Sequence, residues 1–139
     1  MSDAANCVYC KIINKELPAF VLYENDCFLV ILDRYPASPG HALIISKQHA
    51  EDIFALPAET AARVFPLAQK IAQALKDALD CTGVNIVQNN GATAGQSVFH
   101  FHTHVIPRYD NDAVGLLLNS KDMPLDELEE ICKEITGDI

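Results

Sequence analysis

The chain has 139 residues with a formal net charge of −9, and half of its residues are hydrophobic. This length suits one compact domain, and the hydrophobic content excludes an intrinsically disordered chain. A strongly acidic chain repels polyanions, so we expect no nucleic-acid partner. The start of the chain lacks a basic segment followed by an apolar one, and the longest apolar run, residues 27–32, is too short to cross a bilayer. We therefore expect a cytoplasmic protein with reduced cysteines and no membrane contact.

Five short segments are rich in branched and aromatic residues, a composition typical of β-strands. A turn over residues 24–26 joins the first two segments. The predicted strands are residues 20–23, 27–32, 42–46, 84–88 and 99–106.

The clearest helix is predicted over residues 58–79, where apolar residues recur at helical spacing. Pro66 lies inside this segment, and we expect it to kink the helix or to delay its start. Gly83 is the expected stop signal. A shorter helix is predicted after Pro124, with its apolar residues on one side.

The order of these elements predicts an α+β fold with an antiparallel five-stranded sheet, because several strands precede the long helix and two follow it. We expect a single domain over residues 1–139. Its core, with the functional site, would be residues 1–109. Residues 110–139 would form a tail with the shorter helix, and this tail holds nine of the nineteen acidic residues. Such a charge run is typical of a solvated face.

Three of the five histidines fall within five residues, in SVFHFHTHVIPRY. In a strand, this alternation places His100, His102 and His104 on one face and the residues between them on the other. We expect the apolar face to pack on the core and the imidazole face to line a polar cleft. The other two histidines, His41 and His49, lie earlier in the chain.

A neutral imidazole is a good nucleophile near pH 7 when something accepts the proton on its other nitrogen. A second imidazole can stabilise charge on a phosphoryl oxygen, so the pattern favours phosphoryl chemistry. The alternative is a metal site. Along a strand, His100 and His104 would lie about 13 Å apart at their backbones, whereas ligand nitrogens on one zinc ion lie about 3.4 Å apart. Two neighbouring histidines could therefore share an ion, but all three could not without a bend.

The histidine-rich segment resembles the motif of a known family. The segment HFHTHVI fits the His-φ-His-φ-His-φ-φ pattern of the histidine triad (HIT) family, with Thr103 as the one non-apolar residue at a φ position. The segments CVYCKIINKELPAFVLYENDCFLVILD, PASPGHALIISKQH and NIVQNNGATAGQSVFHFHTHVIPRY extend the resemblance to the Hint-like branch and its bacterial relatives. Only the chain after Tyr109 is generic.

The resemblance implies the HIT fold, a homodimer with a continuous sheet, and hydrolysis or transfer at the α-phosphate of a purine nucleotide derivative. In that scheme His102 attacks phosphorus and forms a nucleotidyl-histidine intermediate, which water releases. His104 contacts the phosphate, and the backbone carbonyl of His100 holds the proton on the other nitrogen of His102. His41 lies beside the triad as a supporting group.

The resemblance also implies a nucleotide pocket. Asp33 would bind the ribose hydroxyls, since a carboxylate accepts two hydrogen bonds. Arg108 follows the triad closely enough to reach a leaving phosphate, although we expect it to form a surface ion pair. The apolar lining of the base would be Val8, Tyr9, Ile12, Ile31 and Leu32, for which ordinary core packing is the alternative. The phosphate loop would include Asn89, Gly95, Gln96 and Ser97, where backbone N–H groups and a hydroxyl can hold an anion.

Cys7 and Cys10 form a C-x-x-C motif, which is compatible with redox chemistry, zinc binding or packing. A thioredoxin-like site needs a βαβ context that is not predicted here. This sequence resembles bacterial relatives in which two cysteines and two histidines bind zinc. The resemblance implies a structural zinc ion, with no open position, bound by Cys7, Cys10, His49 and His100. No organic cofactor is expected, and the remaining cysteines are expected to be buried packing residues: Cys27, Cys81 and Cys132.

Three functions stay open at this stage. The leading one is a nucleoside 5′-monophosphoramidase, which splits a purine 5′-monophosphate from an amine or a similar leaving group. The second is a dinucleoside polyphosphate hydrolase of the Fhit type. The third is a nucleotide-binding or scaffold protein whose chemistry is incidental. The opening block of the sequence favours the first over the second, but the sequence does not choose between adenine and guanine.

Overall fold

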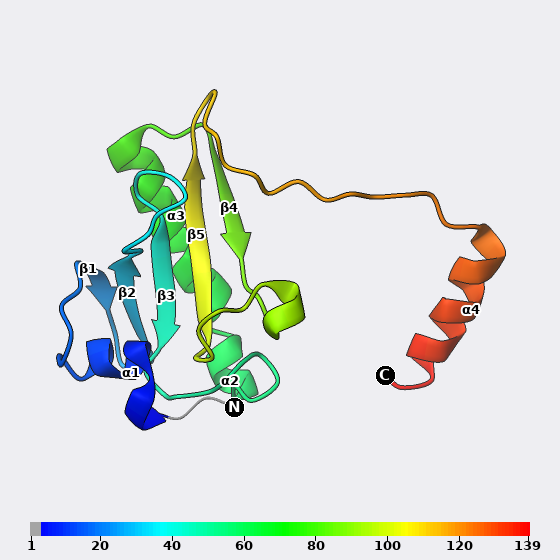
Figure 1. Cartoon of the computed structure of the whole chain (residues 1–139), viewed down its shortest axis with the longest axis horizontal. Coiled ribbons are helices and arrows are strands. Elements are labelled where there is room, and N and C mark those ends of the chain that lie inside the picture. The colour runs from blue at the N-terminus through cyan, green and yellow to red at the C-terminus, as the bar shows by residue number, and fades with distance from the viewer. Residues whose placement is uncertain (1–3) are drawn as a thin grey trace.

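A computed structural model describes residues 4–139 (Figure 1). Five antiparallel strands form one sheet in the order β1-β2-β3-β5-β4. This arrangement confirms the predicted α+β fold with a five-stranded antiparallel sheet. The strands are β1 (Val21–Glu24), β2 (Phe28–Leu32), β3 (Ala42–Ser46), β4 (Gly83–Val87) and β5 (His102–Arg108).

One face of the sheet is covered by helix α3 (Val64–Leu79), which runs across it (Figure 1). The helix buries residues at helical spacing, among them Leu67, Ile71 and Leu75, in the main hydrophobic core. Phe101 and Val105, which alternate with the histidines, belong to the same core. The prediction that the apolar side of the triad segment packs on the core is therefore confirmed.

The opposite face of the sheet carries a second apolar cluster beneath helix α1 (Val8–Ile13). Helix α1 was not predicted from the sequence. It begins where the Sγ atom of Cys7 accepts a hydrogen bond from the backbone N–H of Cys10. His102 and His104 lie on this face, so their surroundings are in part apolar rather than a purely polar cleft. The strand register aligns two rows across the sheet: Leu29, Ile45 and His102 in one, and Ile31, Leu43 and His104 in the other.

The first four strands agree with their predicted bounds to within one residue, but β5 begins later than predicted. His100 lies in a bend before the strand, because its ring nitrogen Nε2 bonds to the carbonyl of Ser46 and Phe101 bonds to Ala50. The prediction that one strand holds all three histidines is therefore wrong for His100. Only His102 and His104 share a strand face.

The long predicted helix is divided into α2 (Ala58–Ala61) and α3. Pro66 lies in the first turn of α3, where its missing N–H leaves no helical bond unmade. The delayed start is thus confirmed. The predicted stop is wrong: Asp80 ends the helix with a left-handed φ of 55°, while Gly83 begins β4. Aspartate tolerates this conformation better than most residues do.

The remaining elements are two short 3₁₀ helices, η1 (Ala4–Asn6) and η2 (Ala92–Ala94), and the helix α4 (Leu125–Thr136). The last of these confirms the predicted shorter helix after Pro124. An extended segment carries α4 away from the sheet, on the side of β4 (Figure 1). All residues from 115 to 139 are exposed, including Cys132, which was expected to be buried. Within residues 4–139, no helix combines the length and the apolar character that a membrane span requires.

Thr103 offers a test of the packing beneath the histidines. Its Oγ1 is the one fully enclosed side-chain polar atom among residues 4–139 that has no hydrogen-bond partner. Leaving such a hydroxyl unpaired costs roughly 1–3 kcal/mol. We expect Thr103→Val, which has a similar shape, to raise the free energy of unfolding by about 1 kcal/mol in urea denaturation. Thr103→Ser, which keeps the hydroxyl, should give no increase. Equal stabilities of Thr103→Val and the parent would show that the hydroxyl has a partner in solution.

Candidate active site and metal centre

The ring of His102 is held in one tautomer by the backbone. Its Nδ1 lies 2.7 Å from the carbonyl oxygen of His100. A carbonyl only accepts, so Nδ1 carries the proton and Nε2 keeps its lone pair. Nε2 of His102 makes no hydrogen bond to the described residues. It is not enclosed either, because the enclosed side-chain polar atoms of residues 4–139 all have a partner except Thr103 Oγ1. Nε2 is therefore exposed to solvent. The predicted nucleophilic nitrogen is thus available, on a side chain that is otherwise buried.

His104 presents an N–H donor instead of a lone pair. A chain of hydrogen bonds that begins at the backbone N–H of Ala37 fixes its tautomer. The N–H of Ala37 donates to Nδ1 of His41 at 2.9 Å, so neutral His41 carries its proton on Nε2. That Nε2 lies 2.9 Å from Nδ1 of His104, which must therefore accept. Neutral His104 then carries its own proton on Nε2. One histidine of the strand thus offers a lone pair and the other offers an N–H donor.

Burial keeps these rings neutral. It lowers the pKa of His104 to about 4, and the neighbouring His102 and His41 act in the same direction. Burial also lowers the pKa of His102 and of His41, while the carboxylate of Asp33 opposes both shifts. A neutral His102 keeps the lone pair that a nucleophile needs near pH 7.

Asp33 lies at the edge of this site. Its carboxylate accepts the N–H of Tyr35 at 2.9 Å and comes within 3.4 Å of Nε2 of His41. Asp33, His41 and His104 are close enough to resemble a metal-binding group. The tautomers speak against a second metal, because Nε2 of His41 carries a proton that it donates to His104. A ligand nitrogen must offer a lone pair.

A separate cluster joins the C-x-x-C motif to the bend before β5. The Sγ of Cys7 and the Sγ of Cys10 lie 3.2 Å and 3.5 Å from Nδ1 of His100. Nδ1 of His49 is 3.2 Å from the Sγ of Cys10 and 3.1 Å from Nδ1 of His100. The predicted set of four therefore meets at one point. Ligand atoms around a tetrahedral zinc ion lie about 3.3–3.8 Å apart, so the donor set fits this metal.

The protonation of the cluster fits the same conclusion. Nε2 of His100 donates to the carbonyl of Ser46 at 2.6 Å, so Nδ1 faces the sulfur atoms with its lone pair. Burial lowers the pKa of His100 to about 4. Burial, together with Cys7, raises the pKa of the Cys10 thiol to about 11, so a metal ion would bind in exchange for that proton.

The loop between β4 and β5 folds around its own glycines and one buried glutamine. Gly91 and Gly95 both adopt positive φ angles, and Gly95 lies against the side chain of Asn89. Both amide hydrogens of Gln96 are used inside the protein, on the carbonyls of Glu51 and Val98. Gln96 therefore shapes the loop. Ser97 is exposed and its hydroxyl makes no hydrogen bond to the described residues, so it is free to bind an anion.

The expected apolar lining of the base divides between the two sheet faces. Tyr9, Ile12 and Ile31 belong to the cluster on the histidine face, and the Tyr9 ring lies edge-on to His102, with their centroids 4.9 Å apart. Val8 is half exposed in α1. Leu32 pairs with Ala42, which belongs to the core beneath α3. Leu32 therefore lies on the α3 face of the sheet and not on the histidine face.

Arg108 forms the ion pair that the sequence analysis expected. Its guanidinium contacts both carboxylate oxygens of Asp112 at 2.8 Å and also donates to Asn85. These contacts hold the pKa of Asp112 far below its usual range. The side chain is engaged at the end of β5 rather than free for a substrate.

Two contributors to the site were missed from the sequence. The N–H of Ala37 fixes the tautomer of His41, and the carbonyl of Ser46 fixes that of His100. Both are backbone groups, so no side-chain motif could have revealed them. Pro36, Pro39 and Gly40 precede His41, and their composition indicates only a turn.

The sequence of this chain matches a known protein family. Residues 14–111 match the model of the HIT domain, which is more than half of the chain. The chain belongs to the HIT family. An adenosine 5′-monophosphoramidase from Saccharomyces cerevisiae is 39% identical to this HIT protein over 135 residues, which cover 96% of this chain and 82% of the yeast protein.

Two solved structures of related proteins share the fold of this chain. A HIT family protein from Bacillus anthracis is 40% identical, with a TM-score of 0.91 over 99% of both chains. A zinc-bound histidine triad family protein from Mycobacterium smegmatis is 34% identical, with a TM-score of 0.77 over 99% of this chain and 100% of that one.

The tautomer of His104 is directly testable. We expect nitrogen-15 NMR to show a neutral ring protonated on Nε2 from pH 7 down to about 4, whereas a free histidine titrates near 6.5. In His41→Ala the preference for Nε2–H should weaken, because Nδ1 loses its donor. A ring of His104 that is already charged at pH 6 would contradict this assignment.

The same shift has a consequence for stability. The unfolded chain takes up this proton near pH 6.5 and the folded chain only near pH 4. The contribution of His104 to stability therefore falls as the pH decreases through this window.

Proposed function

We propose that this HIT protein is a nucleotidyl hydrolase that acts at the α-phosphate of purine nucleotide derivatives, with a nucleoside 5′-monophosphoramidate as the preferred class of substrate. The observation that carries the proposal is the fixed tautomer of His102. Its Nδ1 proton is held by the carbonyl of His100, and its Nε2 is open. The relation to a yeast adenosine 5′-monophosphoramidase supports this choice of substrate.

The chemistry follows from the two opposite tautomers. Nε2 of His102 attacks phosphorus, the bond from phosphorus to the amine breaks as the amine takes up a proton from solvent, and a nucleotidyl-histidine forms. The carbonyl of His100, which accepts the Nδ1 proton, stabilises the positive charge that the ring acquires. Water then attacks phosphorus and releases the nucleoside monophosphate, which returns the lone pair to Nε2.

The N–H donors of the site would hold the phosphate. Nε2–H of His104 points from the same strand face and would donate to a non-bridging oxygen. The hydroxyl of Ser97 would donate from the loop, which Asn89, Gly95 and Gln96 shape. Donors that are fixed before the substrate binds stabilise developing charge without reorganisation.

The nucleoside would lie beside α1. Asp33 would accept hydrogen bonds from the ribose hydroxyls. Its carboxylate lies 3.4 Å from Nε2 of His41, at the edge of the site, which supports this role. Val8, Tyr9, Ile12 and Ile31 would contact the base with apolar surface. Leu32 is not part of the proposed pocket, because the strand register places it on the α3 face of the sheet.

Replacement of His102 tests the proposal. We expect His102→Ala to lower turnover of adenosine 5′-phosphoramidate by roughly a thousandfold or more, while AMP affinity changes only a few-fold. Thr103→Val is the matched control, since this neighbour faces α3 and should keep full turnover. Mass spectrometry of an acid-quenched reaction should find the nucleotidyl group on His102. Unchanged turnover of His102→Ala would overturn the assignment.

The choice of substrate separates the alternatives. Faster turnover of diadenosine polyphosphates than of the phosphoramidate would identify the Fhit type of hydrolase. Tight binding of both compounds without turnover would identify a nucleotide-binding protein.

We further propose that Cys7, Cys10, His49 and His100 hold a structural zinc ion. When bound, the ion would supply a cross-link between the start of the chain and the bend before β5. The interatomic distances and the free lone pair of His100 support this assignment, as does the zinc-bound relative. All four positions of a tetrahedral ion would be filled by protein, which leaves none for a substrate.

Zinc content is a direct measurement. We expect about one zinc per chain in protein purified without added metal, and a loss of several kcal/mol of stability on chelation. Cys10→Ser should lower the zinc content, whereas Cys132→Ser should not, since that cysteine is exposed on α4. A metal-free parent protein of unchanged stability would refute the assignment.

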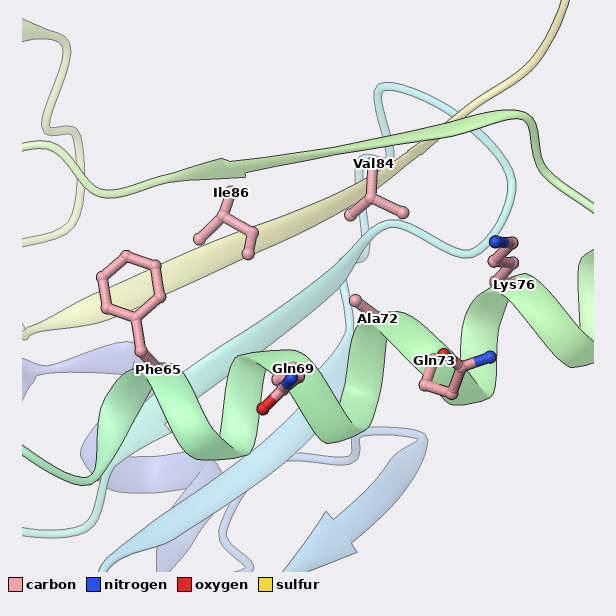
Figure 2. A pocket seen from close by; sticks show the side chains of 7 residues that line it. All are labelled: Phe65, Gln69, Ala72, Gln73, Lys76, Val84 and Ile86. Carbon is pink, nitrogen blue, oxygen red and sulfur yellow. The ribbon is translucent and has the colours of Figure 1, made fainter.

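The sheet also supports the expected homodimer. Of its two edges, β1 is broken by an irregular register between Val21 and Tyr23, which hinders pairing. Strand β4 is regular along its whole length against β5 and leaves its outer edge free. Beside it, Phe65, Val84 and Ile86 line an apolar groove between α3 and β4 (Figure 2). We propose that two copies pair their β4 strands antiparallel about a twofold axis.

A further inference from the structure

The end of the chain carries apolar surface that its own domain does not cover. Helix α4 places its apolar residues on one side, at spacings of three and four. On the other side lie acidic residues, among them Glu127, Glu130 and Glu134. The exposed fractions of the apolar side chains are 84% for Leu125, 46% for Leu128, 36% for Ile131 and 54% for Ile135.

The segment that leads to α4 is apolar and exposed as well. Leu117 and Leu118 are about nine-tenths exposed, at 94% and 89%. An isolated helix of 12 residues is marginal in water, so α4 needs a surface on which to bury its apolar side. A contiguous apolar surface of this kind marks an interaction site.

The direction of this segment is fixed where it leaves the sheet. Arg108 binds Asp112 and the carbonyl of Val114, and the hydroxyl of Tyr109 donates to the carbonyl of Pro39 at 2.7 Å. From this anchored start the chain runs past the edge strand β4 and away from its own sheet (Figure 1). The segment therefore points toward the place that a copy paired at β4 would occupy.

Strand pairing defines where the segment would meet that copy. Gly83, the first residue of β4, pairs with Arg108, so the segment leaves beside the start of β4. In an antiparallel pair, the start of one β4 lies next to the end of the other. The segment thus meets the partner at the end of its β4, where the loop of residues 88–97 begins.

The size of the interface points the same way. A stable dimer uses about 20–30 residues from each side. Strand β4 supplies five residues, and the groove adds a few from α3, which falls short of this range.

The placement of residues 115–139 is shared with a solved structure. These residues are a substantial part of the chain, and a TM-score of 0.91 over 99% of both chains requires them to superpose.

We propose that residues 115–139 form an exchange arm that binds a second copy of this chain and buries the apolar side of α4 on it. The inference rests on the dimer of the proposed function, and each copy would give one arm and receive one. The arm would add apolar contact to the interface that β4 and the groove beside it provide.

Crosslinking of mixed isotopes tests where the arm binds. Unlabelled and nitrogen-15-labelled chains are mixed, allowed to exchange, and treated with a lysine-reactive crosslinker. Lys133 on α4 is the reporter. We expect crosslinked peptides from Lys133 to the core of the other copy, with one labelled and one unlabelled member. Crosslinks from Lys133 that are only of the same isotope would overturn the proposal, because the arm would then bind its own chain.

A pair of charge-matched variants tests what the arm contributes. The double variant Leu128→Glu, Ile131→Glu changes the net charge by −2 on the apolar side of α4. Lys133→Glu makes the same change away from that side. We expect the double variant to raise the dimer dissociation constant at least tenfold in sedimentation equilibrium, and Lys133→Glu to leave it within about twofold.

The outcomes separate the arm from the dimer. A parent chain that is monomeric at all concentrations would contradict the dimer itself. A dimer whose dissociation constant is the same in both variants, without mixed-isotope crosslinks, would contradict only the arm.

Discussion

The hydrogen bond from His102 to the carbonyl of His100 is the interaction on which the rest of the site depends. It decides which nitrogen of His102 keeps a lone pair, and it exists because the chain bends before β5. The bend is held on both sides: the ring of His100 bonds to Ser46, and its other nitrogen lies among the sulfur atoms of the cysteine cluster. His100 therefore serves two sites at once, through its ring and through its carbonyl. A disturbance of the cysteine cluster would reach the ring of His102 by this path.

The second constraint is that two histidines of one strand face present different groups to solvent. Their environments are alike in burial, and burial lowers the pKa of both. What separates them is the partner of Nδ1. For His102 this partner is a carbonyl, which accepts; for His104 it is the N–H of His41, which donates. The same side chain thus presents a lone pair at one position and a proton at the other, without a charge on either ring.

The distribution of charge reconciles an acidic protein with the anionic ligand that we propose. Nine of its nineteen acidic residues lie from Asp110 onward, outside the core that holds the histidines. The repulsion that excludes a polyanion over the whole chain is therefore weaker at the site itself, where N–H donors dominate. The helix α4 concentrates that acidity on one side and apolar residues on the other, which is the pattern of a segment built to lie on a surface.

The sequence pattern was sufficient to predict the strands and the long helix, because the spacing of apolar residues indicates which side of each element faces the core. The family resemblance implied the triad and the set of two cysteines and two histidines, and the structure brings the donor atoms of that set together. The sequence pattern failed for helix α1, for the bend at His100 and for the stop at Asp80, where a cap, a distant carbonyl or a tolerated left-handed residue decides the backbone.

By itself, then, the sequence determined the alternation of the strands, the amphipathic helices and the presence of imidazoles and thiols. Only the tertiary structure decided which proton sits on which nitrogen. Tautomers depend on the group opposite each ring, and the groups opposite His41, His100 and His102 are backbone atoms brought there by folding.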